Sequence, residues 1–402
     1  MDRRDGTALP PTLARQLESV RRQMHDGVAA WQRQSPVDAP NARLPVEGYT
    51  SEAVREREIE RLFRPLPLIV GHASELAPGQ VLANDDHGVP LLLARDGDGR
   101  FRAFWNVCRH RGMRLVETAS APVDRRSVVC PYHGWTYGLD GGLRHRLHAD
   151  TFDPCPATDT DLVALPAEER HGLLWVVPTA GAAIDVAAWL GPLDAEMPFL
   201  DVASLVHFRT VRTEVDANWK LIVDAFLEAY HIRVLHRDTI RPFFADGVTA
   251  TDRVGPHIQS LVARLAAGEW AGAGGRVEDV RDTAALCRLV TPTNVVFPNA
   301  IHIFHPDYLS VITLHPVAAG RLRWVHRMLI PKGKTTPDWL PHWEKTFRLI
   351  EEGVFQKEDI ACAVGIQRGF ASGANGHLVV GRAEQGVGWF HDAVRERLDP
   401  AA

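Results

Sequence analysis

Apolar residues recur at steps of three and four near the start of the chain. Between residues 11 and about 33 the apolar positions are Leu13, Leu17, Val20, Met24, Val28 and Trp31. This spacing predicts an amphipathic helix, because such residues share one helix face. We expect it to pack on the body of the protein or on another subunit. A stretch rich in proline and polar residues, from Ser35 to Pro45, predicts a loop. We therefore assign 1–44 to an N-terminal helical segment.

From about Leu66 the pattern changes to short apolar runs separated by turn residues. One run covers 89–94, a charged turn with two glycines covers 95–100, and a second run covers 101–104. Two runs joined in this way predict a β-hairpin. We predict a β-rich domain over 45–165.

The second half of the chain has patterns of both kinds. A helical pattern runs from about Ala217 to Leu235, strands are expected within 288–330, and long helices are expected over 338–352 and 354–370. Strands followed by helices favour an α+β domain with an antiparallel sheet. We assign 166–402 to this domain.

Composition places the chain among ordinary globular proteins. Of its 402 residues 45% are hydrophobic and 24% are charged, with a formal net charge of -5. This charge and the lack of a basic tract give no reason to expect nucleic acid as a partner. No apolar run approaches the roughly 18 to 20 residues that span a bilayer, so we expect no membrane segment. Without a recognisable secretory signal we predict a cytoplasmic protein, with Cys155, Cys287 and Cys362 reduced.

Two short pairs of cysteine and histidine carry most of the chemical information. Cys108 and His110 are one residue apart, Cys130 and His133 are two apart, and 19 residues separate the pairs. Two thiolates for one iron and two imidazoles for the other are the ligands of a Rieske 2Fe–2S centre. The alternative is a structural Cys2His2 zinc site. Such sites usually pair cysteine with cysteine and histidine with histidine, which this chain does not do.

The residues around these pairs resemble a known family. The stretches 106–115 and 130–135 are similar to the Rieske segment of the large (α) subunit of ring-hydroxylating oxygenases, a class of Rieske non-haem iron oxygenases. The Rieske proteins of respiratory complexes have a further cysteine pair that bridges the ligand loops, and none lies between Cys108 and Cys130. The resemblance implies one 2Fe–2S cluster per chain, bound by Cys108, His110, Cys130 and His133.

A second set of candidate ligands lies on the helix predicted from Ala217. His231 and His236 are five residues apart, which is a rotation of about 140° on a regular α-helix. We therefore expect the helix to be distorted or broken between them, with i→i+5 turns of the kind found at functional sites. A Rieske centre needs an electron acceptor, and two histidines with one carboxylate form the facial triad of non-haem Fe(II) oxygenases. Residues 218–231 also resemble the mononuclear-iron helix of the same family, which implies one Fe(II) per chain.

The third ligand must come from elsewhere, and residues 354–362 offer two candidates. On a helix Asp359 lies on an apolar stripe with Phe355 and Cys362, whereas Glu358 is rotated from it by about 100°. A carboxylate in an apolar stripe is costly unless it is paired or bound to a metal. Asp359 also matches the position of the family's acidic ligand. We favour Asp359 over Glu358, for which the alternative is a solvated surface acid.

Two further acids of the same helix are candidate catalytic residues. Glu228 lies three residues before His231 and therefore on the same helix face. The resemblance implies that this acid connects His133 of one subunit to His231 of the next, and hence a homo-oligomer, usually a trimer. Ring dihydroxylases typically have aspartate here, so the glutamate favours the carnitine and choline type of monooxygenase. Asp224, one turn earlier, is a candidate for proton supply.

The resemblance implies a terminal oxygenase, which takes electrons from NAD(P)H through a separate reductase or ferredoxin. Its substrates would be O2 and a small organic molecule. The reaction would be aromatic-ring hydroxylation, as in aromatic hydrocarbon catabolism, or monooxygenation or demethylation of an aliphatic or quaternary-ammonium compound. No Gly-x-Gly-x-x-Gly motif follows a predicted strand, so we expect no nicotinamide site on this chain. The alternative is a Rieske electron-transfer protein without oxygenase activity, which leaves the domain after residue 170 unexplained.

The sequence offers several candidate residues for substrate recognition, but each of them also has a structural explanation. Trp270, Trp324 and Trp389 are candidates for a cation–π cage around a quaternary amine, although core packing also accounts for each of them. His302 and His305 are candidates for substrate contact or for capping a strand.

Overall fold

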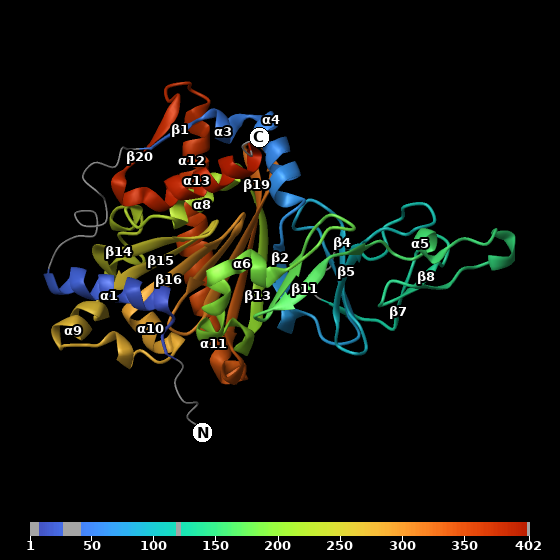
Figure 1. Ribbon diagram of the computed structural model, residues 1–402, viewed down its shortest axis with the longest axis horizontal. Coiled ribbons are helices and arrows are strands. Elements are labelled where there is room, and N and C mark those ends of the chain that lie inside the picture. The colour runs from blue at the N-terminus through green and yellow to red at the C-terminus, as the bar shows by residue number, and fades with distance from the viewer. Residues whose placement is uncertain (1–7, 27–41, 118–121, 400–402) are drawn as a thin grey trace. The chain divides into compact units, whose positions relative to one another are not determined.

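The computed structural model describes residues 8–26, 42–117 and 122–399. They form two compact units, one of residues Phe63–Trp189 and one of the described residues within 1–62 and 190–402 (Figure 1). The smaller unit begins and ends later than the range 45–165 expected from the sequence. Its last strand, β12 (Leu173–Val176), pairs with its first, β2 (Leu68–His72), and this pairing extends the unit beyond residue 165.

The strands of the smaller unit are paired antiparallel. One sheet has the order β10-β5-β4-β3-β6, and two smaller sheets have the orders β11-β12-β2 and β7-β8-β9. The other strands are β3 (Gln80–Asn84), β4 (Leu91–Arg95), β5 (Phe101–Trp105), β6 (Val123–Asp124), β7 (Ser127–Val129), β8 (Thr136–Gly138), β9 (Leu143–His145), β10 (Ala164–Leu165) and β11 (Ala167–Arg170). The predicted hairpin is confirmed as the pair β4–β5, in which Leu91 lies opposite Trp105.

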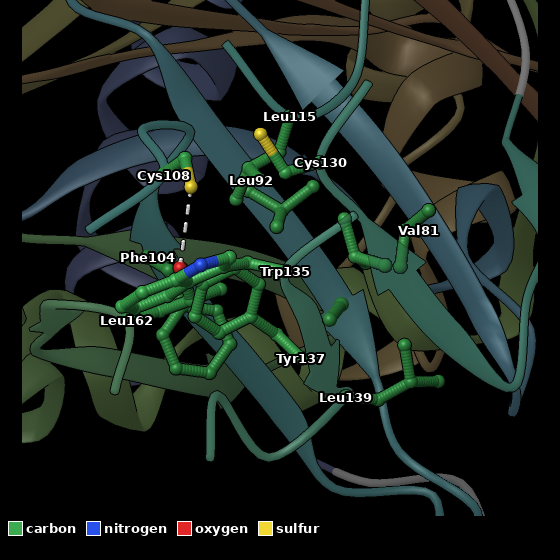
Figure 2. Packing of buried hydrophobic residues seen from close by; sticks show 12 residues of the cluster. Val81, Leu92, Phe104, Cys108, Leu115, Cys130, Trp135, Tyr137, Leu139 and Leu162 are labelled. Atoms are coloured by element: carbon green, nitrogen blue, oxygen red, sulfur yellow. Dashed lines mark hydrogen bonds between the residues drawn. The ribbon is translucent and has the colours of Figure 1, made fainter. Parts of the chain in front are cut away.

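Side chains alternate between two hydrophobic clusters along the central strands of this unit. On β4, Leu91 and Leu93 belong to one cluster, whereas Leu92 and Ala94 belong to the other. This alternation is the period of two that a strand imposes. Figure 2 shows the second cluster, which includes both cysteines of the Cys/His pairs. The β-rich core therefore anchors the two candidate ligand loops.

The larger unit contains a seven-stranded antiparallel sheet with the order β13-β19-β18-β17-β16-β15-β14. Its strands are β13 (Leu205–Val215), β14 (Phe244–Val254), β15 (His257–Arg264), β16 (Val290–Val296), β17 (Ala300–Phe304), β18 (Leu309–Ala318) and β19 (Arg321–Pro331). The strands predicted within 288–330 are thus confirmed. The main helices are α1 (Pro11–Asp26), α4 (Glu52–Glu58), α8 (Trp219–Phe226), α9 (Ala266–Gly272), α10 (Thr283–Leu289), α11 (Leu340–Phe347), α12 (Ala361–Phe370) and α13 (Gln385–Leu398).

The N-terminal helix packs on this sheet, as expected. Leu13, Leu17 and Val20 are fully buried, and the Gln16 side-chain amide donates to the Gln259 carbonyl of β15 at 3.0 Å. The predicted positions Val28 and Trp31, and the first part of the predicted loop from Ser35, lie outside the described residues. The end of that loop is a strand instead, because β1 (Ala42–Pro45) pairs with β20 (His377–Val380).

The helices near the candidate iron ligands differ from the prediction. The helix expected over 217–235 ends at Phe226. The two helices expected over 338–352 and 354–370 form one continuous run, because the π-helix η11 (Arg348–Ile360) connects α11 to α12. Within the described part of the chain, no helix combines the length and the apolar character needed to cross a membrane.

Candidate metal centres

Two loops of the smaller unit have the same backbone hydrogen bonds. The Gly112 amide donates to the Cys108 carbonyl and the Gly134 amide donates to the Cys130 carbonyl, each at 3.0 Å. Each cysteine amide in turn donates to the carbonyl of the residue after the glycine, at 2.7 and 2.8 Å. Gly112 and Gly134 have φ angles of 76° and 71°, which glycine adopts without steric cost. Each Cys/His pair therefore lies in a loop of the same build.

The cysteines of these loops are buried, and the Nδ1 atoms of the two histidines lack a hydrogen-bond partner among the described residues. Cys108 and Cys130 are each 2% exposed, and the rings of His110 and His133 lie edge to face with centroids 4.7 Å apart. The Nδ1 atoms of both histidines are buried without a hydrogen-bond partner among the described residues. Buried polar atoms are normally paired, so both are available to bind a group outside the chain. Burial lowers the pKa of His110 and keeps it neutral, as a metal ligand must be. This donor set fits a 2Fe–2S cluster.

Two aromatic residues of the hydrophobic cluster support this site (Figure 2). The Tyr137 hydroxyl lies 3.3 Å from the Cys108 sulfur and accepts a hydrogen bond from the Arg109 amide at 3.1 Å. The Trp135 ring stacks on the His110 ring with the centroids 5.0 Å apart and the planes inclined by 2°. Trp135 and Tyr137 lie two and four residues after His133 in the sequence, but no role was predicted for either.

The second candidate centre begins with α8, whose first turn is fixed by Asn218. The Asn218 side chain accepts a hydrogen bond from the Lys220 amide at 2.9 Å, which is a helix N-cap. It also donates to the Ala319 carbonyl at 2.7 Å, so that the start of α8 is tied to the end of β18. These contacts give Asn218 a structural role at the start of α8.

After α8 the chain forms a 3-10 turn instead of the wider i→i+5 turns that were predicted. The Glu228 carboxylate accepts the backbone amides of Tyr230 and His231, the latter at 3.1 Å. A 3-10 turn, η6 (His231–Arg233), follows, and the amides of Val234 and Leu235 both donate to the His231 carbonyl. The predicted break is confirmed, but the predicted i→i+5 turns between His231 and His236 are wrong. Side-chain acceptance of the free amides ends the helix early.

The two histidines converge on Asp359 of η11. The Nε2 atom of His236 lies 3.1 Å from Oδ1 of Asp359, and the Nε2 atom of His231 lies 3.8 Å from the same oxygen. One ligand atom from each of the three residues lies within 4.8 Å of the others. Asp359 is 4% exposed, which is costly for a carboxylate unless a cation is bound nearby. This donor set fits a divalent ion such as Fe(II), with positions left open.

The opposite nitrogen of each histidine contacts a glutamate. Glu228 contacts Nδ1 of His231, and Oε2 of Glu358 lies 2.7 Å from Nδ1 of His236. The Thr239 hydroxyl donates to the same Glu358 oxygen at 2.8 Å. Carboxylates in this position fix the ring orientation and the tautomer of a metal-binding histidine. The alternative interpretation of Glu358 as a solvated surface acid is therefore wrong.

The electrostatics of His236 reflect this environment. Burial alone would lower its pKa, but the carboxylates of Asp359 and Glu358 outweigh burial and raise the pKa above its ordinary value. Two carboxylates around one buried imidazole hold negative charge that a bound cation would neutralise.

The candidate triad borders two cavities of the larger unit. One cavity has a volume of about 690 Å³, and its lining includes Asp224, Glu228 and Cys362. The other has a volume of about 510 Å³ and is lined mainly by apolar side chains of η11, the sheet and the segment after α8. His231 and Asp359 line both cavities, whereas His236 lines only the second.

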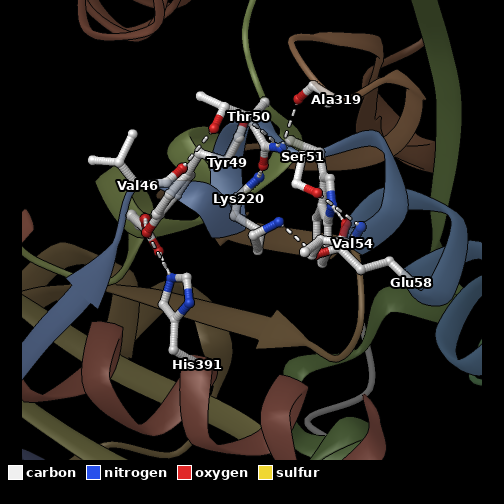
Figure 3. A network of polar contacts seen from close by, with 12 residues as sticks. Val46, Tyr49, Thr50, Ser51, Val54, Glu58, Lys220, Ala319 and His391 are labelled. Atoms are coloured by element: carbon white, nitrogen blue, oxygen red, sulfur yellow. Dashed lines mark hydrogen bonds and ion pairs between the residues drawn. The ribbon is translucent and has the colours of Figure 1, made fainter. Parts of the chain in front are cut away.

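Asp224 belongs to a separate polar group beside the first cavity. It accepts a hydrogen bond from the Tyr49 hydroxyl at 2.7 Å, and its other oxygen lies 2.9 Å from Nε2 of His391. Tyr49 and His391 are themselves 2.9 Å apart (Figure 3). Burial and then the Asp224 carboxylate raise the pKa of Tyr49, so its hydroxyl stays protonated and donates. Asp224 is not brought into contact with the triad.

Of the residues predicted to contact substrate, only His305 lines one of the two cavities. Trp270, Trp324 and Trp389 do not line either cavity, and Trp324 is fully buried in β19. His302 is fully buried in β17, where burial lowers its pKa to about 4. His305 lines the smaller cavity and stacks on Tyr308, with ring centroids 4.1 Å apart.

Two family profiles match the chain. The family described as Rieske [2Fe-2S] domain matches residues 67–156, and the family described as ring hydroxylating alpha subunit (catalytic domain) matches 202–400. These matches confirm the predicted order of a Rieske domain followed by an α+β catalytic domain of the mononuclear-iron class. They also confirm the two predicted cofactors, since these are the cofactors of the two families.

Several curated proteins are similar to parts of the chain. The carnitine monooxygenase oxygenase subunit of Acinetobacter pittii is 34% identical over 207 residues, which are 50% of this chain and 53% of that protein. The glycine betaine monooxygenase oxygenase subunit of Chromohalobacter salexigens is 32% identical over 223 residues, 55% of this chain and 49% of that protein. The chain thus spans about half the length of these relatives. Chloroplastic choline monooxygenase of Spinacia oleracea is 25% identical over 88% of this chain and 78% of its own.

Solved structures show the same fold. The quaternary ammonium Rieske monooxygenase CntA in complex with L-carnitine has a TM-score of 0.73 at 24% identity, covering 88% of this chain and 95% of that one. Naphthalene 1,2-dioxygenase from Rhodococcus sp. has a TM-score of 0.72 at 19% identity, covering 98% of this chain and 99% of that one. At this identity the likeness concerns the fold.

Several residues of the two sites were not predicted. Glu358 was considered only as a rival ligand, and no role was foreseen for Tyr137, Tyr49 or His391. The one sequence signal for Glu358 was its position directly before Asp359, the favoured third ligand.

Proposed function

We propose that this chain, a member of the ring-hydroxylating oxygenase family with a Rieske domain, is a terminal oxygenase that incorporates oxygen from O2 into a small organic substrate. The observation that carries the proposal is the convergence of His231, His236 and Asp359 at the wall of an apolar cavity of about 510 Å³. A Rieske protein that only transfers electrons needs neither a second metal site nor a substrate cavity. The oxygenase therefore explains both units of the chain.

We assign the ligands of the two metal sites as follows. Cys108, His110, Cys130 and His133 would hold the 2Fe–2S cluster, and His231, His236 and Asp359 would hold the iron. When bound, the cluster supplies single electrons and the iron supplies the activation of O2. The support for Asp359 over Glu358 is geometric. Asp359 faces the Nε2 atoms of both histidines, whereas Glu358 faces Nδ1 of His236 only.

The chain's own residues would prepare the site for this chemistry. Glu228 and Glu358 hold the two imidazoles in the tautomer that presents Nε2 to the metal. The apolar wall, including Phe226, Ile303 and Phe355, excludes water and holds the substrate beside the ligands. We assign Asp224 to a supporting role in proton supply, through its contacts with Tyr49 and His391.

We further propose that the protein acts as a ring-shaped homotrimer, in which Glu228 connects His231 to His133 of a neighbouring copy. Supporting this, large apolar side chains are exposed beside each metal site. Tyr132 is 57% exposed next to His133, and Tyr230 and Val234 are 71% and 79% exposed beside His231. Exposed apolar groups next to functional sites mark surfaces for protein contact. The electron donor would be a separate reductase or ferredoxin.

The relatives support a proposal for the type of reaction. The names of the carnitine and glycine betaine relatives describe monooxygenases of quaternary ammonium compounds, and a structural neighbour is a naphthalene dioxygenase. We propose monooxygenation as the main reaction, because glutamate stands at position 228 as in the carnitine type. Hydroxylation of an aromatic ring is the second candidate.

Metal content and spectroscopy test the proposal. Anaerobically purified protein should contain about three irons per chain, two in a cluster and one at the triad, with a Rieske-type EPR signal after dithionite reduction. With a reductase and NADH, it should consume O2 only when an organic substrate is present. The variant Cys130→Ser should lose the visible colour, whereas a colourless wild-type protein containing about one zinc would contradict the proposal.

A further inference from the structure

The smaller cavity contains one cation whose charge is not balanced. Arg264, the last residue of β15, is the one lysine or arginine that lines it among the described residues. The only hydrogen bond of its guanidinium within the described chain is a long one, 3.4 Å, to the Thr291 hydroxyl, and no carboxylate lies within ion-pair distance. A guanidinium in an apolar cavity is costly without a partner.

The groups near Arg264 do not supply that partner. Cys287 and Tyr308 would balance it only if ionised, but burial raises the pKa of Cys287 to about 12 and that of Tyr308 far above its ordinary value. Both are therefore neutral at physiological pH. Asp307 is the remaining acid on this side, and its carboxylate lies 2.9 Å from Nε2 of His342. Asp307 also lines the cavity, but its carboxylate pairs with His342, so no carboxylate of the described residues pairs directly with the Arg264 guanidinium.

Arg264 also occupies the aromatic surface that a cationic substrate would need. Its guanidinium lies over the rings of Phe243 and Phe244, at 5.9 and 5.4 Å from the ring centroids. A quaternary amine binds such faces by cation–π attraction, so here it would meet a positive charge already in place. At this end of the cavity the electrostatics favour an anion.

His305 is a neutral hydrogen-bond donor close to Arg264. His305 lines the same cavity, and its Nε2 atom is buried without a hydrogen-bond partner among the described residues. Burial, and then the positive charge of Arg264, lowers the pKa of His305 to about 3, so the imidazole stays neutral. A carboxylate has acceptor sites for several donors at once. Arg264, Thr291 and His305 together offer such donors on one wall.

We propose that Arg264 binds a carboxylate of the substrate, so that the substrate class is a small organic acid whose apolar part lies in the remainder of the cavity. The proposal rests on the proposed oxygenase function, because the same cavity is lined by His231, His236 and Asp359. With the carboxylate held by the guanidinium, the orientation of the molecule relative to these ligands is fixed. Arg264 is then a specificity-determining residue rather than a metal ligand.

Matched probes of different charge test this without turnover. Phenylacetate, phenylacetamide and phenethylamine, and the series hexanoate, hexanamide and hexylamine, are titrated by calorimetry into anaerobic protein with both metal sites filled. We expect a carboxylate to bind about 10- to 100-fold more tightly than its amide, the range of a charge-assisted hydrogen bond. The amine should bind more weakly than the amide.

Three variants test whether Arg264 causes the preference for carboxylates. Arg264→Gln should remove most of the carboxylate preference while leaving the affinity for the amides nearly unchanged. Arg264→Lys should retain part of it, because it keeps the charge but loses the bidentate geometry. The matched control is Arg253→Gln on β14, since Arg253 pairs with Glu396 and lines neither cavity. Circular dichroism and iron content verify that each variant is folded and loaded.

The outcomes separate this inference from the proposed function. Equal or tighter binding of the amides or amines, failure of both carboxylates to bind, or a preference that survives in Arg264→Gln would overturn it. If instead carboxylates bind through Arg264 but no compound supports oxygen consumption, the anion site stands and the oxygenase proposal fails. If the protein turns over only neutral or cationic compounds, and Arg264→Gln does not change this turnover, the oxygenase proposal is supported and the anion site is contradicted.

Discussion

Each histidine of the candidate triad faces a carboxylate at both ring nitrogens. His236 has Glu358 at Nδ1 and Asp359 at Nε2, and His231 has Glu228 at Nδ1 with Asp359 beyond Nε2. A ring held from both sides cannot rotate, so its metal-binding nitrogen has a fixed direction. Two neighbouring acids of one helix thus serve different functions. In the proposed metal site, Asp359 would contribute a ligand atom and Glu358 would orient a ligand.

This division of roles leads to a prediction about iron retention. Asp359→Ala should lose nearly all of the mononuclear iron, since it removes a ligand, while the cluster stays bound. Glu358→Gln should retain iron but bind it about 10- to 100-fold more weakly, as is usual when an orienting partner is removed. Iron analysis after dialysis against a chelator measures both. Full iron in Asp359→Ala together with none in Glu358→Gln would reverse the assignment.

Tyr137 allows a prediction for the other site. With Cys108 bound to iron as a thiolate, the Tyr137 hydroxyl at 3.3 Å is its hydrogen-bond donor. Such a bond stabilises the reduced cluster, which carries more negative charge. Tyr137→Phe should lower the reduction potential by about 20–60 mV, corresponding to a net hydrogen bond of about 0.5–1.5 kcal/mol for one electron.

Potentiometric titration followed by EPR measures this change. Tyr132→Phe is the control, because the Tyr132 side chain is exposed and its hydroxyl does not contact either cysteine. An unchanged or higher potential in Tyr137→Phe would show that the hydroxyl does not donate to the bound sulfur.

At the scale of elements, α8 is held in place by a buried ion pair. Lys220 of α8 pairs with Glu58 at the end of α4, and both side chains are almost completely buried (Figure 3). The Trp219 indole donates to the other Glu58 oxygen at 2.8 Å, so the carboxylate is satisfied on both sides. Because α8 leads to His231, this pair ties the candidate ligand to α4, whose residues are far from it in sequence.

Removing one member of that pair should be costly. Lys220→Met leaves a buried carboxylate without its cation, and we expect a loss of about 3–5 kcal/mol in the free energy of unfolding. Adding Glu58→Gln should recover part of the loss. Denaturant unfolding of the loaded protein measures both. The control Lys345→Met, at an exposed position of α11, should change stability by less than about 0.5 kcal/mol. An equally small effect at Lys220 would contradict the expected role.

The elements also show what the sequence could and could not predict. The Cys/His spacing, the histidine pair and the inward position of Asp359 are local patterns, and each could be read from neighbouring residues. The contacts of Asp224 with Tyr49 and of His236 with Glu358 join residues 175 and 122 positions apart. Such pairs depend on how the helices pack. The end of α8 was missed because Glu228 captures two backbone amides, a contact that helix periodicity does not reveal.

At the scale of the whole molecule, the proposed trimer predicts complementation between inactive variants. Cys130→Ser would lack the cluster and Asp359→Ala would lack the iron, so each alone should be inactive. If electrons pass between copies, refolded or co-expressed mixtures should recover about a quarter of wild-type turnover, because in a closed ring that fraction of donor–acceptor contacts is intact.

The mixture needs two controls. Size-exclusion chromatography with light scattering must show the same trimer for the mixture and for the wild-type protein. A mixture in which Asp359→Ala also carries Glu228→Gln should recover nearly as much as the simple mixture, since that copy only donates electrons. Placing Glu228→Gln on the Cys130→Ser copy should abolish recovery. Activity that never returns in any mixture of correct size would argue for transfer within one chain.

The π-helix η11 has a consequence for redesign of this protein. It supplies Asp359 and Glu358 to the candidate metal site, and Ile350, Val354 and Phe355 of the same helix line the smaller cavity. Substitutions on this helix that reshape the cavity for other substrates would also move Asp359 and Glu358. Variants with altered substrate selectivity should therefore also bind iron less well. The lining residues of the sheet, such as Val262, Thr293 and Ile303 on β15, β16 and β17, form a wall that carries none of the candidate ligands. Libraries directed at that wall can reshape the cavity while the metal site stays intact.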